Sequence, residues 1–174
     1  MDVIFCNDFS DNLPLMTEFQ TSVMLRNPVP YIVNSVMILS IVFFMFFTSD
    51  ITKAICIFLF LLLILVYNSE LVWRVKRFSK QTIDREKELN NGSPSGARME
   101  VTYDTLRCKS YNGAFTEVPL YNMKKAYETK HLVVIESKTA NLYYLFKKDS
   151  FTKGTYPEFM EFLKKKDFIN NTNI

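Results

Sequence analysis

Two long apolar blocks constrain this chain more than any other feature of its sequence. The first, YIVNSVMILSIVFFMFF, starts at Tyr31, and the second, AICIFLFLLLILVY, ends at Tyr67. Neither block contains a charged residue. A helix needs about 17 to 25 predominantly apolar residues to cross a bilayer. Because only six residues separate the blocks, the two helices must turn straight back on each other. The sequence therefore predicts a two-span transmembrane helical hairpin over residues 31–68. A buried helix pair in a soluble protein is the alternative, which the lack of a polar face on either block disfavours.

The charges that flank the blocks predict their orientation. Residues 1–30 carry four acidic residues and one arginine, whereas residues 69–98 carry seven basic and four acidic residues. Lys and Arg are enriched on cytoplasmic flanks, so the basic side is predicted to be cytosolic. An even number of spans then places the N-terminus in the cytosol as well.

Several residues beside the blocks have the chemistry of a membrane–water interface. Lys53 lies directly before the second block, in the first turn of its helix, and can extend its ammonium group to the headgroups, and Trp73 is an interfacial aromatic residue. Arg74, Lys76 and Arg77 follow directly. This basic cluster is predicted to contact anionic lipid, to belong to a stalk through which two copies associate, or to act only as a topology signal.

The remaining residues divide into segments of different composition. An N-terminal pattern from Thr17 to Met24 fits either a short amphipathic helix at the membrane interface or a partly ordered tail. The second apolar helix is predicted to continue as a basic stalk until Gly92 breaks it. We expect an N-terminal cytosolic or interfacial segment at 1–30, the hairpin at 31–68, a basic stalk and linker at 69–97, an α+β domain at 98–168 and a tail at 169–174.

The sequence changes to a period of two after Arg98, which is typical of strands. Asn112-Gly113 favours a tight hairpin turn, and Thr155 with Glu158 forms a capping box before a final amphipathic helix. The domain is therefore predicted to be an antiparallel sheet, or a partial barrel, of about six strands with one C-terminal helix. The expected strands are 99–103, 105–109, 114–120, 125–129, 132–136 and 141–146.

The run MEVTYDTLRCKSYNGAFTEVPLYNMKKAYETKHLVVIESKTANLYYLFKKDSF, followed by YPEFMEFLKKK, resembles the YcxB-like family of small bacterial membrane proteins. The resemblance covers most of the chain. It implies a pleckstrin-homology-like domain on the cytosolic side of the bacterial inner membrane, and it implies no catalytic residues. This chain departs from the family at one corner. Family members commonly have a proline after the strand that here ends Phe146-Lys147-Lys148-Asp149, and this chain has none. The departure counts against a ligand site shared with the family at this corner.

An enzyme is not indicated by the residues present. The single histidine, His131, has no nucleophile or carboxylate at a catalytic spacing, and four glycines form no phosphate-binding loop. Cys6, Cys56 and Cys108 lie far apart, without metal-ligand spacing. We therefore expect a protein that is not an enzyme and needs no cofactor or metal.

Binding is the function that remains, and lysines with interleaved tyrosines are its candidate residues. Such lysines could hold the phosphates of a lipid or a nucleotide messenger, although a solvated face has the same pattern. The candidates are Lys124, Lys125, Lys130, His131, Lys147 and Lys148. No duplex nucleic acid partner is expected.

Three functions fit this organisation. The first is a membrane-anchored adaptor that binds a protein or an anionic ligand. The second is an effector of stress or phage defence, triggered by a small anionic ligand such as a cyclic oligonucleotide, whose hairpins then associate and disturb the membrane. The third is an immunity protein against a membrane-active toxin.

Overall fold

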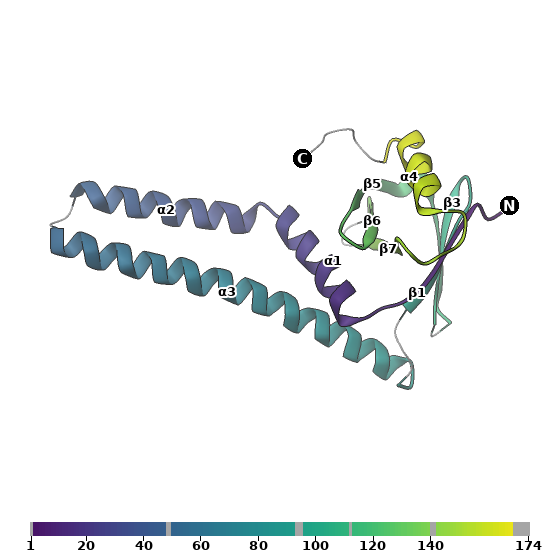
Figure 1. Ribbon diagram of the computed structural model, residues 1–174, viewed down its shortest axis with the longest axis horizontal. Helices are drawn as coiled ribbons and strands as arrows, with labels where there is room; N and C mark the ends of the chain where they lie inside the picture. Colours follow the sequence, from purple (N-terminus) through teal and green to yellow (C-terminus); the bar gives the residue numbers. More distant parts are fainter. Residues whose placement is uncertain (1, 48–49, 93–95, 112, 140–141, 169–174) are drawn as a thin grey trace. The chain divides into compact units, whose positions relative to one another are not determined.

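The computed structural model describes residues 2–47, 50–92, 96–111, 113–139 and 142–168 (Figure 1). The chain forms two compact units, one from residues 1–19 and 80–174 and the other from residues 20–79. We call these the α+β unit and the hairpin unit. The helices are α1 (Leu13–Arg26), α2 (Val29–Phe47), α3 (Asp50–Leu89) and α4 (Tyr156–Lys165), with a 3-10 turn at Leu120–Asn122. The strands are β1 (Phe5–Ser10), β2 (Gly96–Val101), β3 (Thr105–Ser110), β4 (Phe115–Pro119), β5 (Met123–Glu128), β6 (Leu132–Ser137), β7 (Tyr143–Lys147) and β8 (Phe151–Lys153).

The hairpin unit contains α2 and the first part of α3, which run antiparallel beside each other (Figure 1). Among the described helices, α3 is long and apolar enough to cross a membrane. The pair α1–α2 passes the same test only as one bent span, with an angle of 56° between its halves. This bend follows from Pro28, which has no N–H group, and from Asn27, whose Oδ1 accepts the Val29 N–H at 3.0 Å and so starts a new helix.

The expected continuation of the second apolar helix into a stalk is confirmed. α3 extends without interruption for 40 residues, a length of about 60 Å. It ends where Gly92 adopts a φ of 83° and its N–H donates to the Lys87 carbonyl oxygen at 2.8 Å. A positive φ at this position is a common way to satisfy the last carbonyl groups of a helix.

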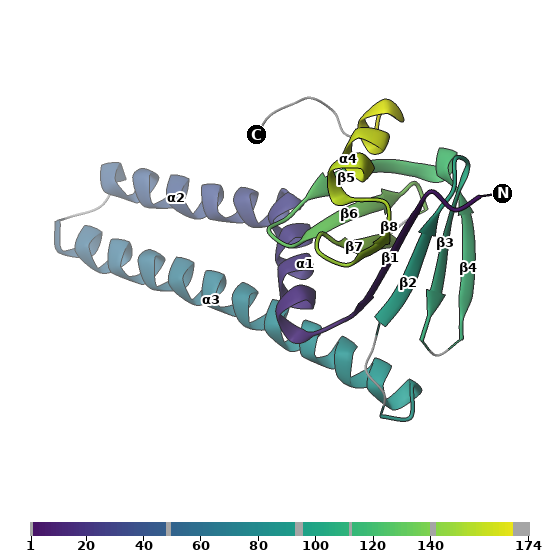
Figure 2. The ribbon, with the colours of Figure 1, turned by 45° about the vertical axis from the view of Figure 1, so that its right-hand side comes forward.

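The α+β unit contains two antiparallel sheets, one of five strands in the order β4-β3-β2-β1-β8 and one of three in the order β5-β6-β7 (Figure 2). The α+β class and the presence of all six expected strands are confirmed, and their hydrogen bonds do not close a barrel within the described residues. Asn112 and residues 140–141, where a turn residue and a strand start were expected, lie outside the described residues, as does the expected tail 169–174.

Two strands were not expected from the sequence. β1 lies between β2 and β8 in the larger sheet, although residues 1–30 were assigned to a tail or an interfacial helix. The sequence of β1 does not alternate between apolar and polar residues, because the polar Asn7 lies between Phe5 and Phe9 on the buried face of the strand. β8 has only three residues, too few to show a period.

The N-terminal helix also differs from expectation. It begins at Leu13 rather than near Thr17, because the side chain of Asn12 accepts the Leu15 N–H at 3.0 Å and caps the helix. Its residues Leu15, Met16 and Phe19 are buried, and the α+β unit includes this part of α1. The apolar side of the helix start is therefore used for packing within the folded unit.

The first half of α1 covers the outer face of the three-stranded sheet. The ring of Phe19 packs against Tyr143 of β7, with centroids 5.3 Å apart. In the central strand β6 all residues from Leu132 to Ile135 are at most 1 % exposed. Val133 and Ile135 belong to the main core, so Leu132 and Val134 face the other side, which must also be covered.

Helix α4 lies at one end of the space between the two sheets (Figure 2). Its predicted capping box is confirmed, because the Thr155 side chain accepts the Glu158 N–H while the Thr155 N–H donates to Glu158 Oε2. Phe159 is fully buried, with ring centroids 4.7 Å from Phe146 and 5.2 Å from Phe5. The core therefore joins α4, β7 and the N-terminal strand.

Candidate functional site

The structure separates the candidate anion-binding residues into two groups. Lys124 and Lys125 lie at the start of β5, opposite the end of β6. The other four lie at the opposite end of the three-stranded sheet, where the Lys148 N–H donates to the His131 carbonyl oxygen at 3.0 Å. The structure thus brings Lys130, His131, Lys147 and Lys148 together and leaves Lys124 and Lys125 apart.

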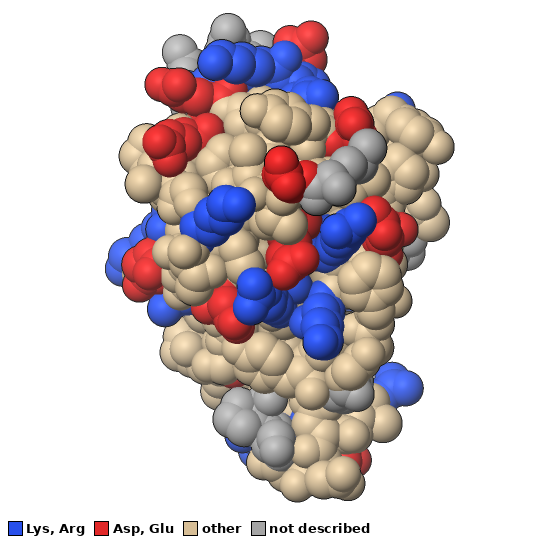
Figure 3. Space-filling model, turned by 90° about the vertical axis from the view of Figure 1, so that its right-hand side faces the viewer, with Lys and Arg blue, Asp and Glu red and all other residues tan. Residues whose placement is uncertain are grey.

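Carboxylates of the same unit accompany most of these basic groups. The ion pairs are Lys124–Glu136 (2.7 Å), Lys125–Glu136 (3.2 Å), Lys148–Glu128 (2.9 Å) and Lys147–Asp149 (3.2 Å), and the His131 ring lies 2.7 Å from the Glu18 carboxylate. Hydrogen bonding to Glu136 raises the pKa of Lys124. An anionic ligand would therefore compete with carboxylates already in place. On the face of the molecule seen in Figure 3, Lys and Arg are likewise interspersed with Asp and Glu.

Glu18 links the N-terminal helix to the turn between β5 and β6. Its carboxylate accepts hydrogen bonds from the Thr129 hydroxyl and from the His131 N–H, the latter at 2.7 Å. Its second oxygen lies 2.7 Å from Nδ1 of the His131 ring. Burial alone would raise the pKa of Glu18, but these hydrogen bonds and the His131 ring together lower it below its ordinary value of 4.5.

Asn7 links the two sheets through its side chain. Its Nδ2 donates to the Lys147 carbonyl oxygen at 2.8 Å, and its Oδ1 accepts the Lys147 N–H at 3.0 Å. The side chain is fully buried, so both backbone groups of Lys147 are satisfied by one amide. This bridge holds the end of β7, and with it the Lys147–Lys148 corner, against β1.

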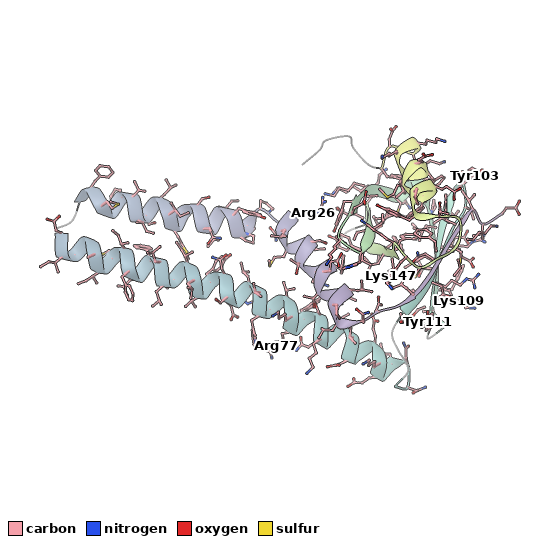
Figure 4. The ribbon with its side chains drawn as sticks, viewed as in Figure 1. Arg26, Arg77, Tyr103, Lys109, Tyr111 and Lys147 are labelled. Atoms are coloured by element: carbon pink, nitrogen blue, oxygen red, sulfur yellow. The ribbon has the colours of Figure 1, made fainter. Side chains whose placement is uncertain are left out.

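A groove of about 460 Å³ lies beside α4. Its apolar lining comes from distant parts of the chain: Ile4, Phe5, Tyr103 and Phe162. Tyr103 is 64 % exposed, and Figure 4 shows it at the opposite end of β3 from Tyr111. The volume falls within the range of about 300 to 1,000 Å³ that is usual for small-ligand sites.

The charged lining of the groove comes from α4 alone, through Glu158, Glu161 and Lys165. Glu158 Oε2 already accepts from the Thr155 N–H and hydroxyl, at 2.9 and 2.8 Å. Within the described part of the chain, Glu161 and Lys165 form no ion pair with any residue. The groove therefore offers charges of both signs that the fold itself does not use.

The residues predicted for the membrane interface lie on α3. The guanidinium of Arg77, which is labelled in Figure 4, lies 4.9 Å from the centre of the Trp73 ring. Arg74 Nε pairs with Glu70 at 3.0 Å. Lys76 is exposed on the same helix. The side chain of Lys53 lies outside the described residues.

A pair of amides sets the register of the hairpin. Asn34 of α2 and Asn68 of α3 each donate from Nδ2 to the other's Oδ1 at 3.2 Å. These two hydrogen bonds join α2 to α3. Because the helices run antiparallel, Tyr31 and Trp73 lie on the same side of this pair, within about two turns of it. Tyr31 and Trp73 therefore lie toward the same end of the helix pair.

Sequence reasoning did not find Glu18, Asn7 or Glu161. Glu18 and Asn7 bind partners more than a hundred residues away, and no local pattern reports such contacts. Glu161 reads as an ordinary exposed position of an amphipathic helix, and only the fold places the β2–β3 turn and the N-terminal segment beside it.

Comparison with known proteins found no matching family model, no matching curated protein and no matching solved structure, so the resemblance to the YcxB-like family stays a prediction.

Proposed function

We propose that this chain is a membrane-anchored binding protein. In this proposal α2 and the apolar half of α3 cross the bacterial cytoplasmic membrane as a two-span hairpin. The α+β unit then lies on the cytosolic side and binds a partner there. The observation that carries the proposal is the pairing of β1 with β2, in register from Phe5 opposite Val101 to Ser10 opposite Gly96.

This pairing restricts how the chain can meet a bilayer. β1 precedes the apolar helices in the sequence and β2 follows them, yet both are strands of one sheet. A single crossing would place them on opposite sides of the membrane, where they could not pair. An inserted chain must therefore cross an even number of times, and α2 with α3 supplies two.

The surface of the hairpin unit supports insertion. Large apolar side chains are exposed along both helices, for example Phe46 and Ile51 at 79 % and Phe58 at 66 %. Exposed apolar surface of this extent marks an interaction with a membrane or a partner. The 19 residues of α2 extend over about 28 Å, close to the hydrocarbon thickness of about 30 Å.

The α+β unit supports a binding role. It contains an open groove with an apolar lining, while most of the candidate lysines already pair with carboxylates. A binding partner that enters the groove therefore suits the unit better than a free anion held by those lysines. This favours the adaptor over an effector that responds to an anionic messenger.

Cysteine labelling in intact bacteria tests the topology. In a background with Cys6, Cys56 and Cys108 replaced by alanine, Ile51→Cys would mark the turn between α2 and α3, and Glu88→Cys the end of the stalk. Both positions are exposed. We expect a membrane-impermeant maleimide to label residue 51 in intact cells and residue 88 only after permeabilisation.

Labelling of both positions from the same side would overturn the two-span arrangement. Extraction with alkaline carbonate provides an independent control. The protein should remain in the membrane pellet, whereas a peripheral protein would be released.

A further inference from the structure

We infer that the groove beside α4 binds a short peptide with free ends, its amino end at Glu158 and Glu161 and its carboxylate at Lys165. This inference rests on the proposed binding function and names the chemistry of the partner. Of the two partners expected from the sequence, a protein or an anionic ligand, the groove favours a peptide, because its two carboxylates outnumber its single lysine.

The spacing of the charges on α4 selects a ligand with two opposite charges. Glu158, Glu161 and Lys165 are separated by three and four residues, which places them on one side of the helix. The distance from Glu158 to Lys165 along the helix axis is about 10 Å, at a rise of about 1.5 Å per residue. The groove thus has an acidic end and a basic end.

The two ends do not neutralise each other in the structure. Glu161 and Lys165 have the four-residue spacing of a helical ion pair, yet no ion pair joins them in the described structure, and both line the groove. Glu158 keeps Oε1 outside the capping bonds, which use Oε2 and the Glu158 N–H. Each end therefore retains a charge that a ligand can pair with.

An extended tripeptide matches these dimensions. Extended chain covers about 3.3 to 3.6 Å per residue, so three residues span about 10 Å. Between the charged ends, the apolar lining of Ile4, Phe162 and the exposed ring of Tyr103 provides contact for the peptide's side chains. The groove volume of about 460 Å³ is sufficient for a ligand of this size.

The test uses the full chain in detergent micelles and three peptides that differ only at their ends. These are alanyl-leucyl-alanine with free ends, its N-acetylated form and its C-terminal amide. Affinity is measured from NMR shifts of backbone amides, and we expect shifts at Gly154 and Phe162, which line the groove. Acetylation should weaken binding to the native protein about fivefold, the upper range for an exposed ion pair. Amidation should act similarly.

Matched variants assign each end of the peptide. In Glu161→Gln, acetylation of the peptide should cause a smaller loss than in the native protein, because only Glu158 then remains at the acidic end. In Lys165→Gln, amidation should cause no further loss. Glu88→Gln is the control, because Glu88 is an exposed carboxylate on α3 away from the groove lining. Tyr103→Ala should weaken binding of all three peptides, whereas Tyr121→Ala removes another exposed tyrosine outside the lining and should have no effect.

Equal affinity for the three peptides, shifts confined to residues outside the groove, or no shift at millimolar peptide would each overturn the inference. These outcomes are independent of the cysteine labelling. A protein that labels as a two-span hairpin but ignores the peptides would retain its membrane topology and lose only the assignment of the groove.

Discussion

At the scale of single residues, Asn7 joins the two sheets through hydrogen bonds to both backbone groups of Lys147. We expect Asn7→Ala to lower the free energy of unfolding of the α+β unit by about 2 kcal/mol, because it leaves the buried N–H and carbonyl groups of Lys147 without partners. Thermal unfolding of the full chain in detergent measures this loss. Asn122→Ala is the control, because its half-buried side chain makes no hydrogen bond in the described structure. Equal midpoints for the two variants would contradict the bridge.

Glu18 makes the stability of the α+β unit depend on pH. Its pKa is lowered in the folded protein, so its contribution is fully present above the ordinary value of 4.5 and is lost as the pH falls through the lower folded value. Glu18→Gln should cost about 1 kcal/mol near neutral pH, because a neutral amide oxygen accepts more weakly than a carboxylate.

The difference between native protein and Glu18→Gln should therefore shrink on acidification below pH 4.5. Denaturant unfolding at several pH values tests this. The comparison uses the difference in unfolding free energy between the two proteins, because three other carboxyl groups also have a lowered pKa. Protonation of these groups in acid destabilises both proteins alike; they are Glu128, Glu136 and Asp149. A difference that is constant with pH would exclude the charged link.

At the scale of elements, the junction of β8 and α4 depends on a glycine. Gly154 has a φ of 72°, and a Cβ there would overlap the Phe5 ring. Gly92 has a φ of 83° but open space around it. Gly92→Ala should cost about 1 kcal/mol of conformational strain, whereas Gly154→Ala should cost about 2 to 3 kcal/mol because crowding adds to it. Thermal unfolding compares the two, and equal costs would show that Phe5 moves aside freely.

The hairpin depends on the pair between Asn34 and Asn68. Asn34→Leu or Asn68→Leu alone removes both hydrogen bonds between the helices, whereas the double variant removes both amides. In Asn34→Leu the Asn68 amide keeps only its bond to the Ile64 carbonyl oxygen, at 2.7 Å. We expect a favourable coupling of about 0.6 to 1.7 kcal/mol, the range known for hydrogen bonds between membrane helices. A double-mutant cycle of unfolding in detergent measures it. Additive losses would mean that the amides do not act as a pair.

At the scale of the whole molecule, the α+β unit is assembled from both sides of the hairpin. β1 pairs with β2 on one edge and with β8 on the other. Residues 96–174 alone would lack Phe5 and Asn7 and expose two unpaired strand edges. We expect this fragment to be sensitive to protease, and a chain in which a flexible linker joins residues 3–19 to residue 96 to be resistant. A stable isolated fragment would contradict this dependence on β1.

The parts of the fold that could be predicted are those with a local signal. The alternation in β2 to β7 and the Thr155–Glu158 capping box involve residues within a few positions of each other. The candidate site could not be predicted in this way. Lysines were visible in the sequence, but their pairing with Glu136 or Glu128 depends on which strands are neighbours.

The sequence by itself determined the two apolar helices, the continuous stalk, the strand pattern of the main sheet region and the closing helix, because periodicity, capping and turn chemistry act over a few residues. Only the tertiary structure decided that Phe5–Ser10 is a strand between β2 and β8, that Glu18 bonds to His131, and that the N-terminal segment and the β2–β3 turn line a groove beside α4. These features depend on contacts between residues that the sequence separates by the whole hairpin. Such contacts arise only when the complete core is packed.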